Sequence, residues 1–134
     1  MANNIIIPIS SYPDQTFSIE LDGIPLQMRV YWSTFNDKMR QLVEEEDGPE
    51  IYGAWHMDIV GSDIELYGLG IVQGCDIIEP YSIPELGGFF VGNIEGKASE
   101  ITYDSLGNEH VLMYILKENL QDFYTAIGYR NATI

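Results

Sequence analysis

Apolar and polar residues alternate along two stretches near the start of the chain. From Thr16 to Leu21, apolar side chains at positions 17, 19 and 21 alternate with polar ones, and from Ile24 to Trp32 every even-numbered residue is apolar. A period of two places successive side chains on opposite faces of a strand, so each stretch predicts a strand with one buried face. Asp22-Gly23 joins the two stretches and suits a tight turn with positive φ at both central positions. The pattern therefore predicts a β-hairpin.

Shorter strands, separated by glycines, are predicted along most of the remaining chain. They lie at residues 5–9, 52–60, 64–72, 87–93 and 110–116. In the strand at 52–60, Trp55, Met57 and Ile59 face inward, and His56 and Asp58 face outward. Short strands broken by glycine are typical of small barrels and sandwiches. We therefore expect a mainly β fold, either a small antiparallel β-barrel or a sandwich.

Residues 33–50 predict a short helical insertion between two of these strands. Ser33 or Asn36 suits the N-cap, and Gly48-Pro49 ends the helix. The inner stripe of this helix would hold Met39, Leu42 and Val43.

A second helical pattern follows the last predicted strand. Leu120, Phe123, Tyr124 and Ile127 are spaced i, i+3, i+4 and i+7, and Gly128 suits the C-cap. A chain of 134 residues fits one domain. We expect a single β-rich domain over residues 1–134, which comprises an N-terminal arm with a short strand (1–15), a β core (16–116) and a helical or irregular C-terminal segment (117–134).

The C-terminal segment also carries a candidate partner interface. Apolar and tyrosine side chains are frequent at the buried centre of protein interfaces. The segment can pack on the chain's own sheet or on a neighbouring subunit, and the pattern leaves both arrangements open. The candidate interface residues are Leu120, Phe123, Tyr124, Ile127 and Tyr129.

The charge of the chain excludes several classes of partner. There are 21 Asp and Glu against 6 Lys and Arg, a net charge of −15, and the basic residues are scattered. Nucleic-acid binding needs clustered cations that displace counterions from phosphate, and anionic membranes attract basic surfaces. We therefore expect no specific nucleic-acid binding and no membrane binding, although an acidic wall lets DNA pass nearby without adhering.

The cysteine count and the N-terminus indicate where the chain is made. Cys75 is the single cysteine, so no intrachain disulfide can form, which fits a reducing cytoplasm. The N-terminus has no basic leader, and the apolar run from Ile5 to Ile9 is too short for a signal-peptide core or a membrane span. We expect no export signal.

A group of acids crowds ahead of a histidine. Residues Glu44 to Asp47 and Glu50 precede His56 and Asp58. A calcium loop needs oxygen ligands that alternate along the loop, whereas these acids are consecutive and interrupted by proline, so a solvated turn is favoured over a weak divalent-cation site. His56 and Asp58 share a strand face and could form half of a zinc site. Because only one other histidine and one cysteine exist to complete it, we favour an ordinary surface pair and expect no metal.

The motifs of catalysis are also missing from the sequence. Cys75 precedes Asp76, whose charge raises the pKa of a thiol and makes it a poor nucleophile. The glycines at residues 68–74 are spaced nearly as in a dinucleotide fingerprint, but no helix pattern follows them. We expect no catalytic residue, no cofactor and no enzyme activity. Trp32 and Trp55 fall on inward faces, yet with the nine tyrosines they leave a small-ligand or carbohydrate-binding β module as the alternative function.

Four segments, taken in order, resemble the small baseplate plug proteins of contractile-tailed bacteriophages. They are FSIELDGIPLQMRVYW (17–32), AWHMDI (54–59), GLGIVQGCDII (68–78) and DSLGNEHVLMYI (104–115). The chain departs from the family pattern where LGNE replaces Leu-Gly-Glu, where the acidic insertion at 33–50 is longer than expected, and beyond Lys117, where the family has no counterpart.

This resemblance implies a non-enzymatic structural part of the virion tail baseplate, made in the host cytoplasm. The protein would plug or line the central hub near the junction of spike and tube. It would do so as a multi-copy symmetric ring that contacts hub, spike, tube or tube-initiator subunits, with edge strands as natural docking elements.

Overall fold

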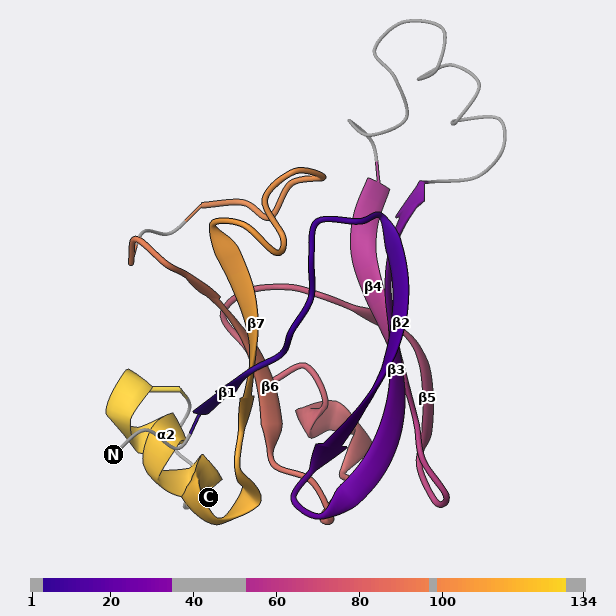
Figure 1. The fold of residues 1–134 in the computed structure, drawn as a ribbon. Helices are drawn as coiled ribbons and strands as arrows, with labels where there is room; N and C mark the ends of the chain where they lie inside the picture. Colours follow the sequence, from indigo (N-terminus) through magenta and orange to yellow (C-terminus); the bar gives the residue numbers. More distant parts are fainter. Residues whose placement is uncertain (1–3, 35–52, 97–98, 130–134) are drawn as a thin grey trace, which may run out of the picture.

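The computed structural model describes residues 4–34, 53–96 and 99–129, which form two antiparallel β-sheets and one C-terminal α-helix (Figure 1). One sheet has the strand order β2-β3-β4-β5 and the other the order β1-β7-β6. The strands are β1 (Asn4–Ile6), β2 (Asp14–Leu21), β3 (Ile24–Thr34), β4 (Gly53–Val60), β5 (Glu65–Gly70), β6 (Gly88–Asn93) and β7 (His110–Ile115). The mainly β prediction is confirmed, and the arrangement is a sandwich. The barrel alternative is wrong, because the two sheets do not close on one another into a single ladder.

The hairpin predicted from the first two alternating stretches is confirmed. β2 and β3 pair in register from Asp14↔Tyr31 to Leu21↔Ile24. Asp22 and Gly23 have φ angles of 51° and 77°, as a two-residue hairpin turn requires. The alternation determines which face is buried, since Met28 and Val30 are fully buried while Arg29 between them is exposed.

The core lies between the two sheets. The four-stranded sheet contributes Met28, Met57 and Ile59, and the three-stranded sheet contributes Phe89 and Leu112, all of which are fully buried. Cross-strand register places Met28 opposite Ile59 on the inner face. Apolar area removed from water contributes about 25 cal/mol per Å², so this shared core holds the sheets together.

The remaining predicted strands exist, and two of them are shorter than predicted by more than one residue. β1 ends at Ile6. The N–H of the next residue, Ile7, still donates to the carbonyl of Leu112 (2.9 Å), but Pro8 has no N–H and cannot continue the ladder. β5 covers residues 65–70 rather than 64–72. Its register against β4 shifts between Met57 and Ile59, and Gly68 within it has a φ of 69°. This is a β-bulge.

The helical insertion predicted between strands is partly wrong at its start. Ser33 and Thr34 continue β3 and pair with Ala54 and Gly53 of β4, so Ser33 does not cap a helix. Asn36 and the rest of the predicted helix, with the acids from Glu44 to Glu50, lie outside the described residues.

The C-terminal helix is confirmed at its predicted position. A short 3-10 turn, η3 (Lys117–Asn119), leads into α2 (Leu120–Ile127), and Gly128 at the C-cap has a φ of 71°. Figure 1 shows α2 against the outer face of the sheet β1-β7-β6. There it packs on Phe90 and Ile115. A second 3-10 turn, η2 (Glu79–Tyr81), lies in the connection between β5 and β6. Among the described residues no helix has the length and apolarity to cross a membrane.

Candidate interaction surface

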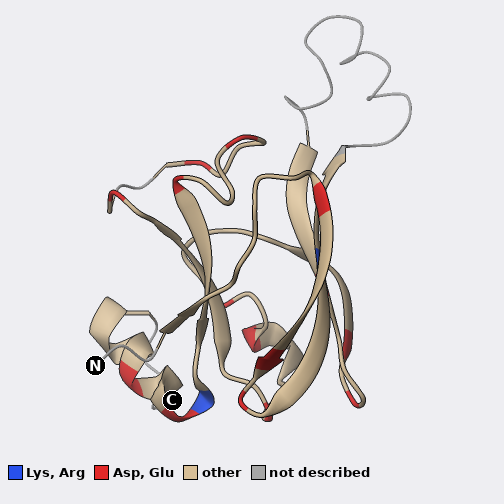
Figure 2. Ribbon diagram, in the orientation of Figure 1, with Lys and Arg blue, Asp and Glu red and all other residues tan. Residues whose placement is uncertain are grey.

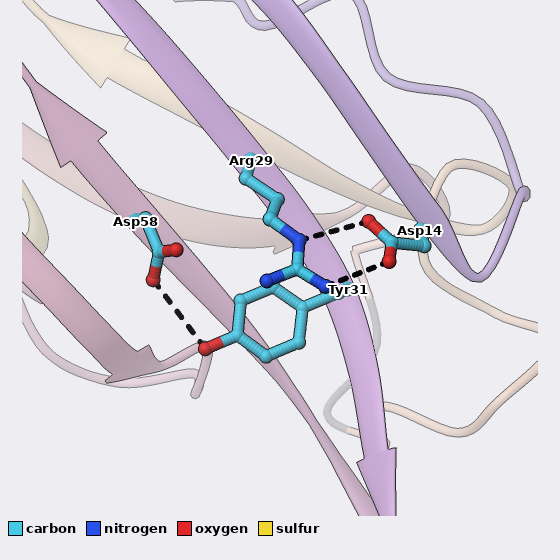
Figure 3. A network of polar contacts seen from close by, with 4 residues as sticks. All are labelled: Asp14, Arg29, Tyr31 and Asp58. Atoms are coloured by element: carbon cyan, nitrogen blue, oxygen red, sulfur yellow. Dashed lines mark hydrogen bonds and ion pairs between the residues drawn. The ribbon is translucent and has the colours of Figure 1, made fainter.

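The outer face of the sheet β2-β3-β4-β5 carries a polar network (Figure 3). Arg29 donates two hydrogen bonds to Asp14, from Nε to Oδ1 (2.9 Å) and from the terminal NH2 to Oδ2 (2.7 Å). The guanidinium also lies over the ring of Tyr31, 4.2 Å from its centroid. The hydrogen bond from Arg29 holds the pKa of the Asp14 carboxyl below its usual range, and the same bond raises the pKa of Arg29. Because both side chains are about half exposed, this pair contributes little to stability.

His56 and Asp58 lie on this outer face, as the alternation predicts. Asp58 Oδ1 accepts hydrogen bonds from the backbone N–H of Gly68 (2.8 Å) and, at 3.4 Å, from the Tyr31 hydroxyl. The Tyr31 ring stacks on His56 at 5.7 Å between centroids. Burial, with the nearby Asp58 charge, raises the pKa of the Tyr31 hydroxyl. Asp58 thus fixes the bulge of β5 to β4. Within the described ranges, no group of three His, Cys, Asp or Glu is placed to hold a metal ion.

Cys75 is half-buried in the loop that follows β5. Burial raises the pKa of its thiol, and the charges of Asp76 and Glu79 raise it further. The direction predicted from the neighbouring Asp76 is confirmed, although burial is the larger cause. A thiol with a raised pKa is a poor nucleophile.

Asp76 is a buried carboxyl with several hydrogen-bond donors, and the sequence pattern did not identify it as a candidate site residue. It is 2% exposed, and its Oδ1 accepts hydrogen bonds from the N–H groups of Ile78 (3.2 Å) and Phe89 (3.1 Å). Its Oδ2 accepts one from the hydroxyl of Tyr124 (2.6 Å). Burial raises the pKa of this carboxyl, and the three hydrogen bonds lower it in part. Since both oxygens are engaged, Asp76 joins the loop, β6 and α2 to one another.

A second, partly buried contact joins the two sheets. Asp22, in the hairpin turn, accepts hydrogen bonds from the hydroxyl of Tyr114 and from the N–H of Lys117 (2.9 Å). The same hydroxyl accepts a hydrogen bond from the N–H of Gly87 (2.6 Å). Burial, with the hydrogen bond to Asp22, raises the pKa of Tyr114. An added Cβ on Gly87 would lie 1.8 Å from the carbonyl oxygen of Ile115, so only glycine permits this close approach.

His110, the other histidine, is fully buried. Its Nδ1 lies 2.7 Å from Ser105 Oγ, and its Nε2 lies 3.1 Å from the carbonyl oxygen of Ser99. Both ring nitrogens therefore serve to hold the loop between β6 and β7.

The candidate interface residues of the C-terminal segment all lie on or directly after α2. Leu120, Phe123, Tyr124 and Tyr129 pack with Phe90 and Ile115 of the chain's own sheet, while Ile127 is 50% exposed. Phe90 makes edge contacts with Phe123 (4.9 Å) and Tyr129 (5.7 Å). The Tyr129 hydroxyl donates to Glu79 Oε1 (2.8 Å). Their role as a partner interface stays a prediction.

A hollow of about 460 Å³ separates α2 from the loop between β5 and β6. Asp76, Glu79 and Lys117 contribute to its lining. The two carboxylates already accept hydrogen bonds from Tyr124 and Tyr129, so neither is placed as a general base for a bound molecule.

The acidic side chains are dispersed over the molecule (Figure 2). Among the described residues, Asp and Glu lie on the sheet β2-β3-β4-β5, in the connecting loops and on α2, whereas the strands of the sheet β1-β7-β6 carry none. The described Lys and Arg positions are far apart. The buried side chains of Asp76 and His110 are engaged in hydrogen bonds within the chain, which fits a structural or binding domain.

Comparison with protein families agrees with this class. Residues 4–118 match the family model described as "Cyanophage baseplate Pam3 plug gp18". The match covers most of the chain, which therefore belongs to this family of phage baseplate plug proteins, and the resemblance seen in the four sequence segments is confirmed. The protein is a structural component of the phage virion tail baseplate. A search of curated proteins gave no match. α2 lies just beyond the matched residues.

Proposed function

We propose that the protein plugs or lines the central channel of a contractile-tail baseplate, near the junction of spike and tube, as a non-enzymatic subunit of a multi-copy symmetric ring. Membership of the plug family carries this proposal, because a plug closes a channel by shape and contact. Its partners would be hub, spike, tube or tube-initiator subunits.

The net charge of −15 supports a place beside DNA. A channel wall must let the genome pass, and carboxylates repel phosphate within a Debye length of about 8 Å at physiological salt. In the described residues the acids are dispersed rather than gathered in one pocket. A dispersed charge fits a wall better than it fits a cation site.

The contacts of the buried polar groups support a role without bond-making. Asp76, Asp22 and His110 bond within the chain, and the half-buried Cys75 thiol has a raised pKa. None of these groups is arranged as a nucleophile beside a base.

The alternative, a small-ligand or carbohydrate-binding β module, rested on the two tryptophans and the nine tyrosines. Trp55 is 2% exposed, and its indole N–H donates to the carbonyl of Thr102 (2.9 Å). Trp32 packs edge-on against Trp55 and Tyr103. Trp55 thus belongs to the packed interior and the half-buried Trp32 packs beside it, so we do not propose this function.

A cryo-electron microscopy map of the intact particle tests the proposal. The expected result is density for this chain around the tail axis, at the end of the tube and with the symmetry of the hub. Density only on the outer wedges of the baseplate would contradict the channel position while leaving the family assignment intact.

A further inference from the structure

Among the described strands four form the edges of the two sheets, and three of these edges are partly covered, short or bulged. An exposed edge is a template for pairing with another chain, and proteins blunt such edges by covering, shortening or bulging them. The outward backbone of β6 is covered, since the carbonyl of Phe89 accepts from Ile77 N (2.9 Å) and its N–H donates to Asp76. β1 is three residues long and is followed by Pro8. β5 carries the bulge at Gly68, whose N–H donates to Asp58.

β2 has none of these protections. It runs for eight residues in unbroken register with β3. It has no proline and no bulge, and between Asp14 and Glu20 it carries no charged side chain. A long, regular edge whose middle carries no charge is the kind that folded proteins avoid leaving bare.

The phase of the ladder shows which backbone groups of β2 point away from β3. The carbonyl of Pro13 accepts a hydrogen bond from Trp32 N (2.8 Å), so odd-numbered residues of β2 exchange hydrogen bonds with β3. The N–H and C=O groups of Thr16, Ser18 and Glu20 therefore point outward. Within the described part of the chain, no backbone hydrogen bond reaches these outward groups.

The inner side of the same strand is incompletely covered. Phe17 and Ile19 pack against the core but remain half-buried. A strand laid along β2 would cover the exposed parts of both side chains and satisfy the outward backbone groups together. This combination of free backbone and alternate apolar contacts is how strand addition gains affinity and specificity.

We infer that the β2 edge is a docking site for an extended segment of another baseplate chain, which adds to the sheet as a fifth strand. The inference rests on the proposed structural role in the baseplate. The segment would carry apolar residues at every second position, to meet Phe17 and Ile19, and neutral or basic residues opposite Asp14 and Glu20.

Charge disfavours a second copy of this chain as the occupant. If two copies paired through β2 about a two-fold axis at Phe17, Asp14 of each copy would lie opposite Glu20 of the other. Like charges directly opposite one another destabilise a strand pair. Each copy also carries a net charge of −15, so the two copies repel as a whole.

Amide hydrogen exchange of the whole protein, free and within isolated baseplates, tests the inference directly. In the free protein the amides of Thr16, Ser18 and Glu20 should exchange fast, and those of Phe17 and Ile19 slowly. In the baseplate the three outward amides should slow by at least about ten-fold, as paired strands do. Unchanged exchange at these three amides would overturn the inference.

A proline variant gives an independent test. Ser18→Pro removes an outward N–H and leaves the ladder to β3 intact, since proline is tolerated on an edge strand whose N–H faces solvent. Ser18→Ala keeps the N–H and serves as the matched control. Added to extracts of cells infected with phage that lack this chain, the proline variant should enter baseplates about ten-fold less than the alanine variant. Equal incorporation of a folded proline variant would overturn the inference. If circular dichroism shows that this variant is unfolded, the exchange experiment decides alone.

Two further measurements distinguish docking of a foreign segment from self-association, and the docking edge from the proposed channel position. Light scattering of the free protein should give a monomer, and a dimer with protected β2 amides would replace the foreign segment with a second copy. Protected β2 amides in a chain that cryo-electron microscopy places outside the channel would uphold the docking edge and contradict the proposed position. Unprotected β2 amides in a chain that lies in the channel would support the proposed position and contradict the docking edge.

Discussion

Asp76 illustrates how a single buried carboxyl organises this fold. It accepts hydrogen bonds from two backbone N–H groups, at Ile78 and Phe89, and from the Tyr124 hydroxyl. An added Cβ on Gly88 would lie 2.5 Å from Asp76 Oδ2, so the carboxyl is also tightly enclosed. A carboxyl without a cationic partner in such a place favours its neutral form.

The raised pKa of Asp76 predicts a pH dependence of stability. Because the folded state holds this proton more tightly than the unfolded chain, whose pKa is near 3.8, the contribution of the group is complete below that pH. It is lost as the pH rises through the folded pKa. Asp76→Asn removes the titration, so the free energy of unfolding of the wild type minus that of the variant should fall with increasing pH. Urea denaturation at a series of pH values measures this difference.

A control variant isolates the effect of burial. Asp122→Asn changes an exposed carboxyl in the first turn of α2. A wild-type advantage over Asp76→Asn that grows with pH would show that the fold prefers the charged carboxylate, contrary to the expectation.

Trp55 is the residue at which packing should matter most. It is 2% exposed and is the largest of the fully buried side chains. We expect Trp55→Ala to lower the free energy of unfolding by about 3–5 kcal/mol, as large core truncations do. Tyr67→Ala, at a position 63% exposed, should change it by less than about 0.5 kcal/mol. Chemical denaturation of both variants measures the contrast, and equal small effects would mean that Trp55 does not fill the core.

At the scale of elements, α2 is attached to the sandwich by aromatic packing and by two tyrosine–carboxylate hydrogen bonds. Phe90 lies at the centre of the packing, with ring contacts to Phe123, Tyr124 and Tyr129. The Tyr124 bond to Asp76 is buried, and the Tyr129 bond to Glu79 is only partly so. The two bonds therefore differ in what their loss should cost.

We expect Tyr124→Phe to destabilise the protein more than Tyr129→Phe. The first change leaves a buried Asp76 oxygen without its donor, which costs about 1–3 kcal/mol. The second leaves Glu79 able to bond to water and should cost about 0.5–1 kcal/mol. Thermal unfolding of both variants compares the costs. Equal losses would indicate that the packing of α2, and not the buried carboxyl, determines its attachment.

The elements were predictable where the signals are local. Asp22-Gly23 between two alternating runs determines the hairpin, its register and its buried face within about 17 residues. The i, i+3, i+4 and i+7 stripe with Gly128 likewise determines α2. Pro8 and the bulge at Gly68 shorten β1 and β5, because pairing fails where an N–H is missing or the register shifts.

The choice between barrel and sandwich depends on contacts that no local pattern encodes. The Tyr114 hydroxyl reaches Asp22 across 92 positions of sequence, and Tyr124 reaches Asp76 across 48. The sequence identifies Asp22 as a turn residue and Asp76 as a neighbour of Cys75, and their second roles follow only from the assembled fold. For the same reason, the bare edge of β2 could be recognised only once the other three edges were known to be partly covered, short or bulged.

At the scale of the whole molecule, the excess of negative charge is the property most directly tied to the proposed place in a channel. Self-repulsion opposes compaction, and the described exposed acids make few ion pairs to offset it. The one salt bridge among the described residues joins Asp14 and Arg29. Charge at this density therefore does not serve stability, and at the proposed place in the channel its effect would be to repel a neighbouring polyanion.

Reversing surface charge should make the channel wall adhere to DNA. Asp63, Glu85, Glu109 and Glu118 are exposed and are not part of β2. Replacing all four by lysine should slow DNA ejection from assembled phage at low salt. Raising the salt concentration should restore the rate, because phosphate contacts weaken steeply with added counterions. Replacing the same four by glutamine is the matched control and should leave ejection unchanged, since it removes repulsion without adding attraction. The fluorescence of a DNA-binding dye measures the ejected DNA for both variants. If the lysine variant ejects DNA at the wild-type rate at every salt concentration, these four residues lie away from the path of the genome.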